Sequence, residues 1–531
     1  MKKKISYILT LWVLVVFASS CYEDKGNYDY VEISEVTTTG LEESYSKIAF
    51  QDVLHIEPTV TSDRAGDEFE YLWTLNLTKG SGTTSDIIEL KLDTIGYERV
   101  LDFPVNLKQG YYDLILRITN KGNGVDVYHV MSLSVITTFS EGFYLLKDMG
   151  NSTDIDLHTW DNSKITDILQ KKDGEALPAS PVSLGIDPLY CFLDESTGEY
   201  VITKALTICT DNDVRIMNIE DMSTIYTHNT MFHNGEVPEE KPYYVWRNVN
   251  GVGYISDQGA YFSAQLATQQ LLGTGKFGFP AMVDEEDSKP NKNGSVSTGA
   301  YYFYFDELKD RFLCLDYNGG LKALANKPKD SEEEAKYVPN GIKHKLKAFV
   351  RNYVGNVDAG FALFEDADVA GKHYLYSMAL DYDDNPTTYN PIKKVTEIAS
   401  DSKLNTATLY ASNELTAKVI YFVNSNKLYM YDTELNTEEE LQLQDFAIGE
   451  EITYVSNRYW TWTDDKEHNF DYLVIATHKT GKYKVYLYEV LGGKAYGKPK
   501  YVFEGDGKVV KMQYVSPKMS DKTLNYFPRS F

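Results

Sequence analysis

The sequence predicts an all-β protein in which a β-sandwich is followed by a β-propeller of about seven blades. Three observations support this: many short segments alternate apolar and polar residues, 42 of 531 residues are tyrosine, and no long amphipathic helix interrupts the pattern. Strand–turn–strand units then recur about every 40 to 55 residues, which is typical of propeller blades. Two stacked sandwiches, the alternative, match the strand lengths but not this recurrence.

The first 20 residues are organised like a secretory signal peptide. Lysines at positions 2–4 precede an apolar run over residues 5–17, and small residues follow at 18–20. An uncleaved membrane anchor is the less favoured alternative, because a spanning helix needs about 20 consecutive apolar residues and this run is shorter. We therefore expect export.

Cys21 follows the small residues and resembles the lipid-modified cysteine of bacterial lipoproteins, with Ala18 in place of the usual leucine. Acyl chains such as palmitate would anchor Cys21, since each buried methylene contributes about 0.8 kcal/mol. Glu23 and Asp24 resemble the signal that exports lipoproteins of Gram-negative anaerobes to the cell surface, whereas a solvated linker is the simpler interpretation. The expected location is the outer membrane, facing the cell exterior, with residues 21–30 as a tether.

The charge balance argues against several partners. The chain has 52 Lys plus Arg against 78 Asp plus Glu, a net charge of -26. Nucleic-acid phosphates and anionic lipid headgroups would repel such a protein, so nucleic acid is not an expected partner.

The remaining cysteines, Cys191, Cys209 and Cys314, form no CxxC pair and indicate no metal centre. Cys191 and Cys209 flank a predicted hairpin, so a disulfide between them stays open. Three buried thiols are the favoured interpretation.

Residues 31–138 form the predicted sandwich. Alternating segments at 54–60, 69–75 and 112–120 and a strand at 127–135 are separated by turn residues. Trp73 is its expected core tryptophan.

Three stretches of this region together resemble a PKD-like family surface lipoprotein: "CYEDKGNYDY" at 21–30, "YLWTL" at 71–75 and "GYYDLILRITN" at 110–120. The resemblance implies an immunoglobulin-like PKD-type domain behind the lipid anchor. It also implies an accessory role in Sus-type nutrient uptake, where an outer-membrane transporter and its lid lipoprotein take up oligosaccharides or peptides.

Residues 139–531 form the predicted propeller. The stretches 301–316, 419–432 and 472–489 each consist of strand, polar turn and strand, with an acidic residue at the end. Six or eight blades are also possible. A strand at 509–515 is left over, and we expect it to complete the blade opened by residues 142–147 and so close the ring.

The sequence holds no motif that commits it to catalysis: HExxH, GxSxG, Walker and Rossmann patterns are all missing. Acidic runs at 285–287, 381–384 and 464–465 could act in glycoside hydrolysis or hold calcium. Among 78 acidic residues, solvated loops explain them better. Asp211–Asp213 could also hold calcium, with an Asx-rich turn as the favoured alternative. No cofactor or metal is expected.

Two aromatic clusters are the ligand-binding candidates. "NRYWTW" places Tyr459, Trp460 and Trp462 before the polar loop "TDDKEHN", and "YYVWRN" places Trp246 beside Arg247. Flat rings at a blade rim can stack on sugars or hold peptide side chains, and arginine can bind a carboxylate. Packing between blades is the favoured alternative.

Together with these observations, the family resemblance implies a non-catalytic surface lipoprotein that captures a peptide or glycan or docks on an uptake complex. One alternative is a propeller glycosidase or lyase acting on extracellular polysaccharide. The other is a purely structural subunit of the transporter complex.

Overall fold

The computed structural model describes residues 34–77, 92–107, 109–233, 235, 237–265, 273–329, 335–381, 385–520 and 523. The predicted signal peptide of residues 1–20, the predicted tether with Cys21, Glu23 and Asp24, and acidic residues 382–384 lie outside the described residues. Within the described ranges, no helix combines the length and the apolar character that crossing a membrane requires.

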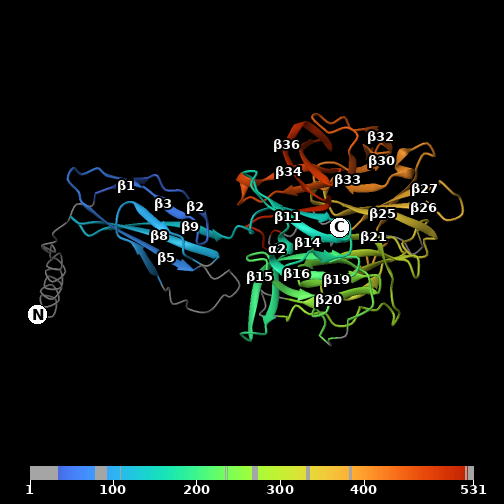
Figure 1. The fold of residues 1–531 in the computed structure, drawn as a ribbon, viewed down its shortest axis with the longest axis horizontal. Helices are drawn as coiled ribbons and strands as arrows, with labels where there is room; N and C mark the ends of the chain where they lie inside the picture. Colours follow the sequence, from blue (N-terminus) through green and yellow to red (C-terminus); the bar gives the residue numbers. More distant parts are fainter. Residues whose placement is uncertain are drawn as a thin grey trace, which may run out of the picture.

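The N-terminal domain is a β-sandwich (Figure 1). A five-stranded sheet has the order β2 (Ser44–Ile48), β9 (Asp126–Ile136), β8 (Gly110–Asn120), β5 (Phe69–Leu77) and β6 (Asp93–Gly96). Two pairs complete the domain: β1 (Val36–Thr39) with β4 (Thr59–Ser62), and β3 (Val53–Ile56) with β7 (Leu101–Pro104). The pair β2–β9 is parallel and the other pairs are antiparallel.

The core of the sandwich lies around Trp73, whose side chain is fully buried among Leu54, Leu101 and Leu114. Its indole Nε1 donates a hydrogen bond to the Glu98 carbonyl at 2.9 Å, which satisfies the one polar group of the ring. The prediction of Trp73 as the core tryptophan is confirmed.

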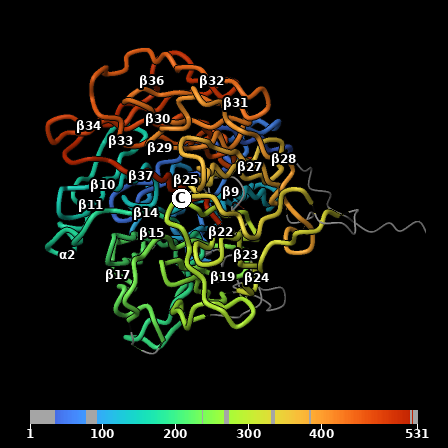
Figure 2. Tube along the Cα trace, turned by 90° about the vertical axis from the view of Figure 1, so that its right-hand side faces the viewer, coloured from blue at the N-terminus to red at the C-terminus, as the bar shows by residue number. Residues whose placement is uncertain are grey.

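Seven further sheets surround a central axis and form the blades of a propeller (Figure 2). Blade 1 contains β37 (Lys508–Val515), β10 (Gly142–Asp148), β11 (Ser152–His158), β12 (Lys164–Ile165) and β13 (Leu177–Pro178). Blade 2 contains β14 (Pro181–Asp194), β15 (Glu199–Thr210), β16 (Val214–Asn218) and β17 (Thr224–Thr227). Blade 3 contains β18 (Pro242–Asn248), β19 (Gly251–Ser256) and β20 (Gly259–Ala264). Blade 4 contains β21 (Pro290–Ser297), β22 (Tyr302–Asp306), β23 (Arg311–Leu315) and β24 (Leu321–Ala323).

The last three blades repeat the four-stranded plan. Blade 5 contains β25 (His344–Asn352), β26 (Ala359–Asp366), β27 (His373–Ala379) and β28 (Ile392–Glu397). Blade 6 contains β29 (Leu409–Ser412), β30 (Val419–Asn424), β31 (Lys427–Asp432) and β32 (Thr437–Glu440). Blade 7 contains β33 (Glu451–Trp460), β34 (Phe470–Lys479), β35 (Lys482–Leu491) and β36 (Lys494–Asp506). The helix α2 (Ile168–Asp173) packs on β11. About seven blades were predicted, and this is confirmed.

The C-terminal strand β37 closes the ring. It pairs antiparallel with β10, with Gly142 opposite Val515 and Leu145 opposite Met512, and it also contacts β33 and β14 of the neighbouring blades. Closure pairs an edge of β10 that would otherwise be free to associate with another strand. The predicted closing strand is confirmed.

Two buried tyrosines show how this residue can fill the space between blades while its hydroxyl bonds a backbone carbonyl. Tyr190 donates to Gly275 O at 2.7 Å and Tyr421 donates to Gly493 O at 2.6 Å. Both rings are fully buried. A large apolar ring with one satisfied polar atom suits such a dry interface.

The cysteines Cys191, Cys209 and Cys314 are all free and buried, so the open question of a Cys191–Cys209 disulfide is decided in favour of thiols. Burial raises the pKa of Cys191 to about 11 and that of Cys209 to about 12, which keeps both protonated at neutral pH. The segment Asp211–Asp213 forms the turn between β15 and β16, and Asp211 pairs with Lys292.

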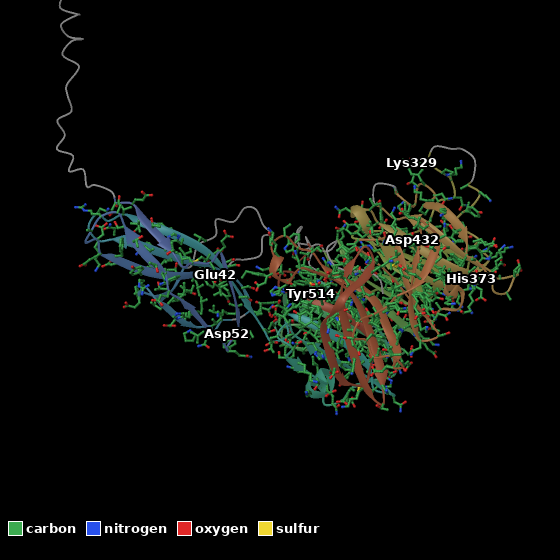
Figure 3. All side chains as sticks on the ribbon, turned by 90° about the horizontal axis from the view of Figure 1, so that it is seen from above. Glu42, Asp52, Lys329, His373, Asp432 and Tyr514 are labelled. Atoms are coloured by element: carbon green, nitrogen blue, oxygen red, sulfur yellow. The ribbon has the colours of Figure 1, made fainter. Side chains whose placement is uncertain are left out.

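The sandwich lies at one end of the propeller (Figure 1). Residues 137–141 connect β9 to β10, and the Tyr111 hydroxyl of the sandwich donates to the Pro517 carbonyl just beyond β37. Figure 3 labels Glu42 and Tyr514 on the two sides of this junction.

Candidate binding cleft between the two domains

A cleft of about 520 Å³ lies between the sandwich and the propeller. Its walls carry hydroxyl groups and charged groups of both signs. The lining residues are Glu42, Ser44, Tyr45, Ser46, Lys47, His55, Ser134, Glu141, Asp464, Asp465, Lys466, Glu467, His468, Pro517 and Lys518. Such a lining can bind a polar ligand through several hydrogen bonds and ion pairs.

The edge strand β2 and the turn before it provide much of the sandwich wall. The Tyr45 hydroxyl accepts a hydrogen bond from the Glu42 backbone N–H at 3.0 Å, which fixes the approach to β2. Among the strands that the structure describes, β2 pairs with β9 alone, so its other edge has no sheet neighbour there. Ser44 and Ser46 of this strand line the cleft.

The propeller wall is the loop between β33 and β34, and Asp465 holds this loop in place. Its carboxylate accepts from Trp460 Nε1 at 2.8 Å, from Ser516 Oγ at 2.9 Å and from His468 Nδ1 at 2.9 Å. Burial alone would raise its pKa, but these hydrogen bonds outweigh burial and hold the pKa of Asp465 below its usual value. Asp465 is therefore an anion that organises the floor of the cleft.

His468 lies between two carboxylates and against an aromatic ring. Besides its bond to Asp465, its Nδ1 lies 3.4 Å from Glu141 Oε1, and its ring stacks on Trp160 with centroids 5.6 Å apart. The hydrogen bond to Asp465 raises the pKa of His468, with the charge of Glu141 acting in the same direction. Burial raises the pKa of Glu141, partly offset by His468.

Pro517 joins the two walls at one carbonyl oxygen. It accepts from Tyr111 of the sandwich and from Lys204 Nζ of blade 2, the latter at 2.7 Å. Burial raises the pKa of Tyr111 to about 12 and lowers that of Lys204 to about 8. Two hydrogen bonds to one buried carbonyl therefore help to fix the junction.

The aromatic candidates do not form a rim platform, and this corrects the expected position of their rings. Trp460 and Tyr459 are 0% and 1% exposed, and Trp462 is half-buried against the core of blades 1 and 7. Trp246 is 3% exposed, and its ring stacks on the Tyr302 ring with 3.8 Å between the two centroids. The physical reason is that β18 and β33 are first strands of their blades, covered by neighbouring blades on both faces.

Trp246 also depends on a glycine in the adjacent strand. A Cβ atom on Gly253 would lie 1.9 Å from the Trp246 ring. The ring thus occupies space that any other residue at position 253 would need. This is the packing role that the sequence favoured over ligand binding.

Arg247 is likewise not exposed to a ligand. Its guanidinium donates to the carbonyls of Leu189 and Gln265, each at 2.9 Å, and lies 3.7 Å from the Asp187 carboxylate. The expected carboxylate clamp is therefore an internal ion pair that joins blades 2 and 3.

The structure does not bring the two predicted clusters together, but it places one of them next to the cleft. Trp460 bonds Asp465, and the "TDDKEHN" loop after it contributes Asp464 to His468. Sequence reasoning missed Glu141 and the sandwich residues around Tyr45. The one available signal was that loop, which carries a histidine among acids directly after an apolar strand. In the described part of the chain, no group of His, Cys, Asp or Glu side chains could hold a metal ion.

The N-terminal region matches a known protein family. Residues 21–181 match the model of the PKD-like family. This region is similar to the PKD-like family. The match begins at Cys21, covers the sandwich and continues through β10 to β13 of blade 1.

Solved structures resemble the chain at low sequence identity. A quinonprotein alcohol dehydrogenase-like protein from Bacteroides thetaiotaomicron is 12% identical, with a TM-score of 0.38 over 92% of this chain and 100% of that chain. Hsv2 from Kluyvelomyces marxianus is 7% identical, with a TM-score of 0.33 over 75% and 94%. The β-propeller domain of Cps50 (Swd1) from Myceliophteria thermophila is 11% identical, with a TM-score of 0.26 over 58% and 96%. No curated protein matches the chain.

Proposed function

We propose that this protein is a non-catalytic binding protein of the bacterial cell surface, and that the cleft between its PKD-like domain and its propeller holds a peptide or glycan. The observation that supports this most is the composition of the cleft, with hydroxyls, lysines and carboxylates around a floor fixed by Asp465. Hydroxyl-rich walls suit sugars, and charges of both signs suit the termini and side chains of a peptide.

An enzymatic role is the second candidate, because one observation favours it. Glu141 and Asp465 approach the same His468 nitrogen, and their environments shift their pKa values in opposite directions. A carboxylic acid beside a carboxylate is the arrangement that glycoside hydrolysis uses. We favour binding because the Asp465 oxygens already accept three hydrogen bonds from within the protein.

The cellular setting is part of the same proposal. Lipid on Cys21 anchors the protein in the outer membrane, Glu23 and Asp24 direct it to the exterior, and it serves a Sus-type transporter and lid lipoprotein. The family match that starts at Cys21 supports this reading. Replacing Cys21 by Ala should abolish palmitate incorporation and release the protein from membranes. Incorporation that persists in this variant would contradict lipidation at Cys21.

Ligand binding can be tested on the chain from residue 22 with peptide and glycan arrays followed by calorimetry. Reversing the charge of Lys47 and Lys466, one on each wall, should weaken binding at least tenfold, the effect of losing about 1.4 kcal/mol. Lys345→Glu, an exposed change on β25, is the matched control.

Two outcomes would favour the alternatives. Co-purification with the transporter without affinity for any peptide or glycan would indicate a purely structural subunit. Turnover of a polysaccharide that is lost in Glu141→Gln would indicate an enzyme.

A further inference from the structure

Two cations lie on neighbouring first strands of the propeller blades, Lys511 on β37 and Arg458 on β33. Strand β37 is the first strand of blade 1, between β33 and β14, and it carries Lys511 opposite Leu146. The Lys511 side chain is partly accessible even though its strand lies at the centre of the ring.

Arg458 of β33 lies along the same edge of β37. Its Nε donates to the carbonyl of Met512, the residue after Lys511, at 2.9 Å, and its Nη2 donates to the Tyr454 hydroxyl at 2.8 Å. Its Nη1 is buried and has no hydrogen-bond partner among the described residues. The side chain is 3% exposed, so this is a buried donor on a charged group.

Neither cation has a carboxylate partner in the part of the chain that the structure describes. The nearby Lys292 is paired with Asp211, with 3.1 Å between Nζ and Oδ1. The chain has a net charge of -26, so two unpaired cations beside each other at its centre require a local explanation.

We propose that Lys511 and Arg458 form a site between β37 and β33 that binds a small oxyanion, a carboxylate or a phosphate group. The unpartnered Nη1 of Arg458 and the Lys511 ammonium would each donate to it, which would satisfy the buried donor and neutralise the pair. Burial lowers the pKa of Lys511 to about 8, and the charges of Arg458 and Lys292 act in the same direction. The site therefore loses one of its charges as the pH rises through 8.

The test measures binding of phosphate and acetate to the purified protein by calorimetry, together with its thermal unfolding, at constant ionic strength and pH 7. Both anions should bind and raise the unfolding temperature, and Lys511→Met should weaken binding roughly tenfold or more. Lys508→Met is the matched control, because Lys508 lies on the same strand and pairs with Glu451 at 2.7 Å. Binding to the wild-type protein should fall between pH 7 and 9.

A second measurement does not depend on affinity. Because an unpaired, half-buried cation destabilises the folded state, Lys511→Met should unfold at a higher temperature than the wild-type protein when no oxyanion is present. Crystals soaked in bromide should also show an anomalous peak beside Lys511 and Arg458. Equal anion dependence in the wild-type protein and Lys511→Met, or no stabilisation by either oxyanion, would overturn the proposal.

Discussion

At the scale of single residues, Asp465 decides the form of the cleft. Three donors from three segments converge on it: Trp460 at the end of β33, His468 in the following loop and Ser516 after β37. A buried carboxylate with several charge-assisted hydrogen bonds stabilises whatever conformation supplies them. The loop that lines the cleft is therefore tied to the closing strand of the propeller.

Replacing Asp465 by Asn should lower the free energy of unfolding by about 1 to 3 kcal/mol, because the amide leaves at least one of the three donors unsatisfied. Urea denaturation measures this. The matched control is Asp464→Asn, since Asp464 is exposed and bonds only Thr463 in the described structure. Equal effects of the two substitutions would show that the Asp465 carboxylate does not organise the loop.

His468 should give the protein a pH-dependent stability near neutrality. Its pKa is raised in the folded state, so its contribution is full below the unfolded value of about 6.5 and is lost as the pH rises through the folded value. The charged groups that act on it are Asp465, Glu141 and Glu467. The free energy of unfolding, measured at pH 6, 7 and 8, should depend less steeply on pH in His468→Gln than in the wild-type protein. His233→Gln, an exposed control, should keep the wild-type dependence. An unchanged slope in His468→Gln would contradict this coupling.

At the scale of elements, closure by β37 explains how seven sheets form one ring. Val509, Met512 and Val515 of β37 are fully buried and pack into the core shared by blades 1, 2 and 7. The strand therefore contributes both backbone hydrogen bonds to β10 and apolar contact to its neighbours. Each of these two contributions to the stability of the ring is modest alone, but both are lost together when the strand is removed.

Ending the chain at Gly507 should leave the edge of β10 unpaired and expose the core of blades 1 and 7. We expect a protein that aggregates on size-exclusion chromatography and lacks a cooperative urea transition. Ending it after Thr523, which retains β37, is the control. A soluble monomer with wild-type unfolding after truncation at Gly507 would show that closure is dispensable.

At the scale of the whole molecule, one carbonyl helps to set the angle between the two domains. Pro517 O accepts from Tyr111 and Lys204, and the linker of residues 137–141 is short. Interfaces within a chain usually permit motion unless specific contacts restrain it. The cleft therefore depends on the junction as much as on its own lining.

The double variant Tyr111→Phe with Lys204→Met should widen the distribution of distances between the domains without changing the unfolding of the propeller. Small-angle scattering, or spin labels on the two domains, measures the distances. Tyr128→Phe, an exposed change on β9, is the control. An unchanged distribution in the double variant would indicate that other contacts hold the domains.

The sequence alone determined the class and the plan of this protein. Period-two alternation places side chains on opposite faces of a strand, so it predicted β8, the core position of Trp73 and the leftover strand at 509–515. The recurrence of strand pairs predicted the propeller. Both patterns can be recognised from the sequence because each is formed by residues close together along the chain.

Only the tertiary structure decided which aromatic residues are buried and which distant segments meet. Tryptophan is equally suited to a binding platform and to a blade interface, and only the neighbouring strands show that Trp246 and Trp460 are buried. The cleft joins residues near 45, 141, 468 and 517, and Arg458 of blade 7 bonds the carbonyl of Met512, next to Lys511, in blade 1. Such sites exist because ring closure and domain packing bring distant segments together, and no spacing along the chain records those distances.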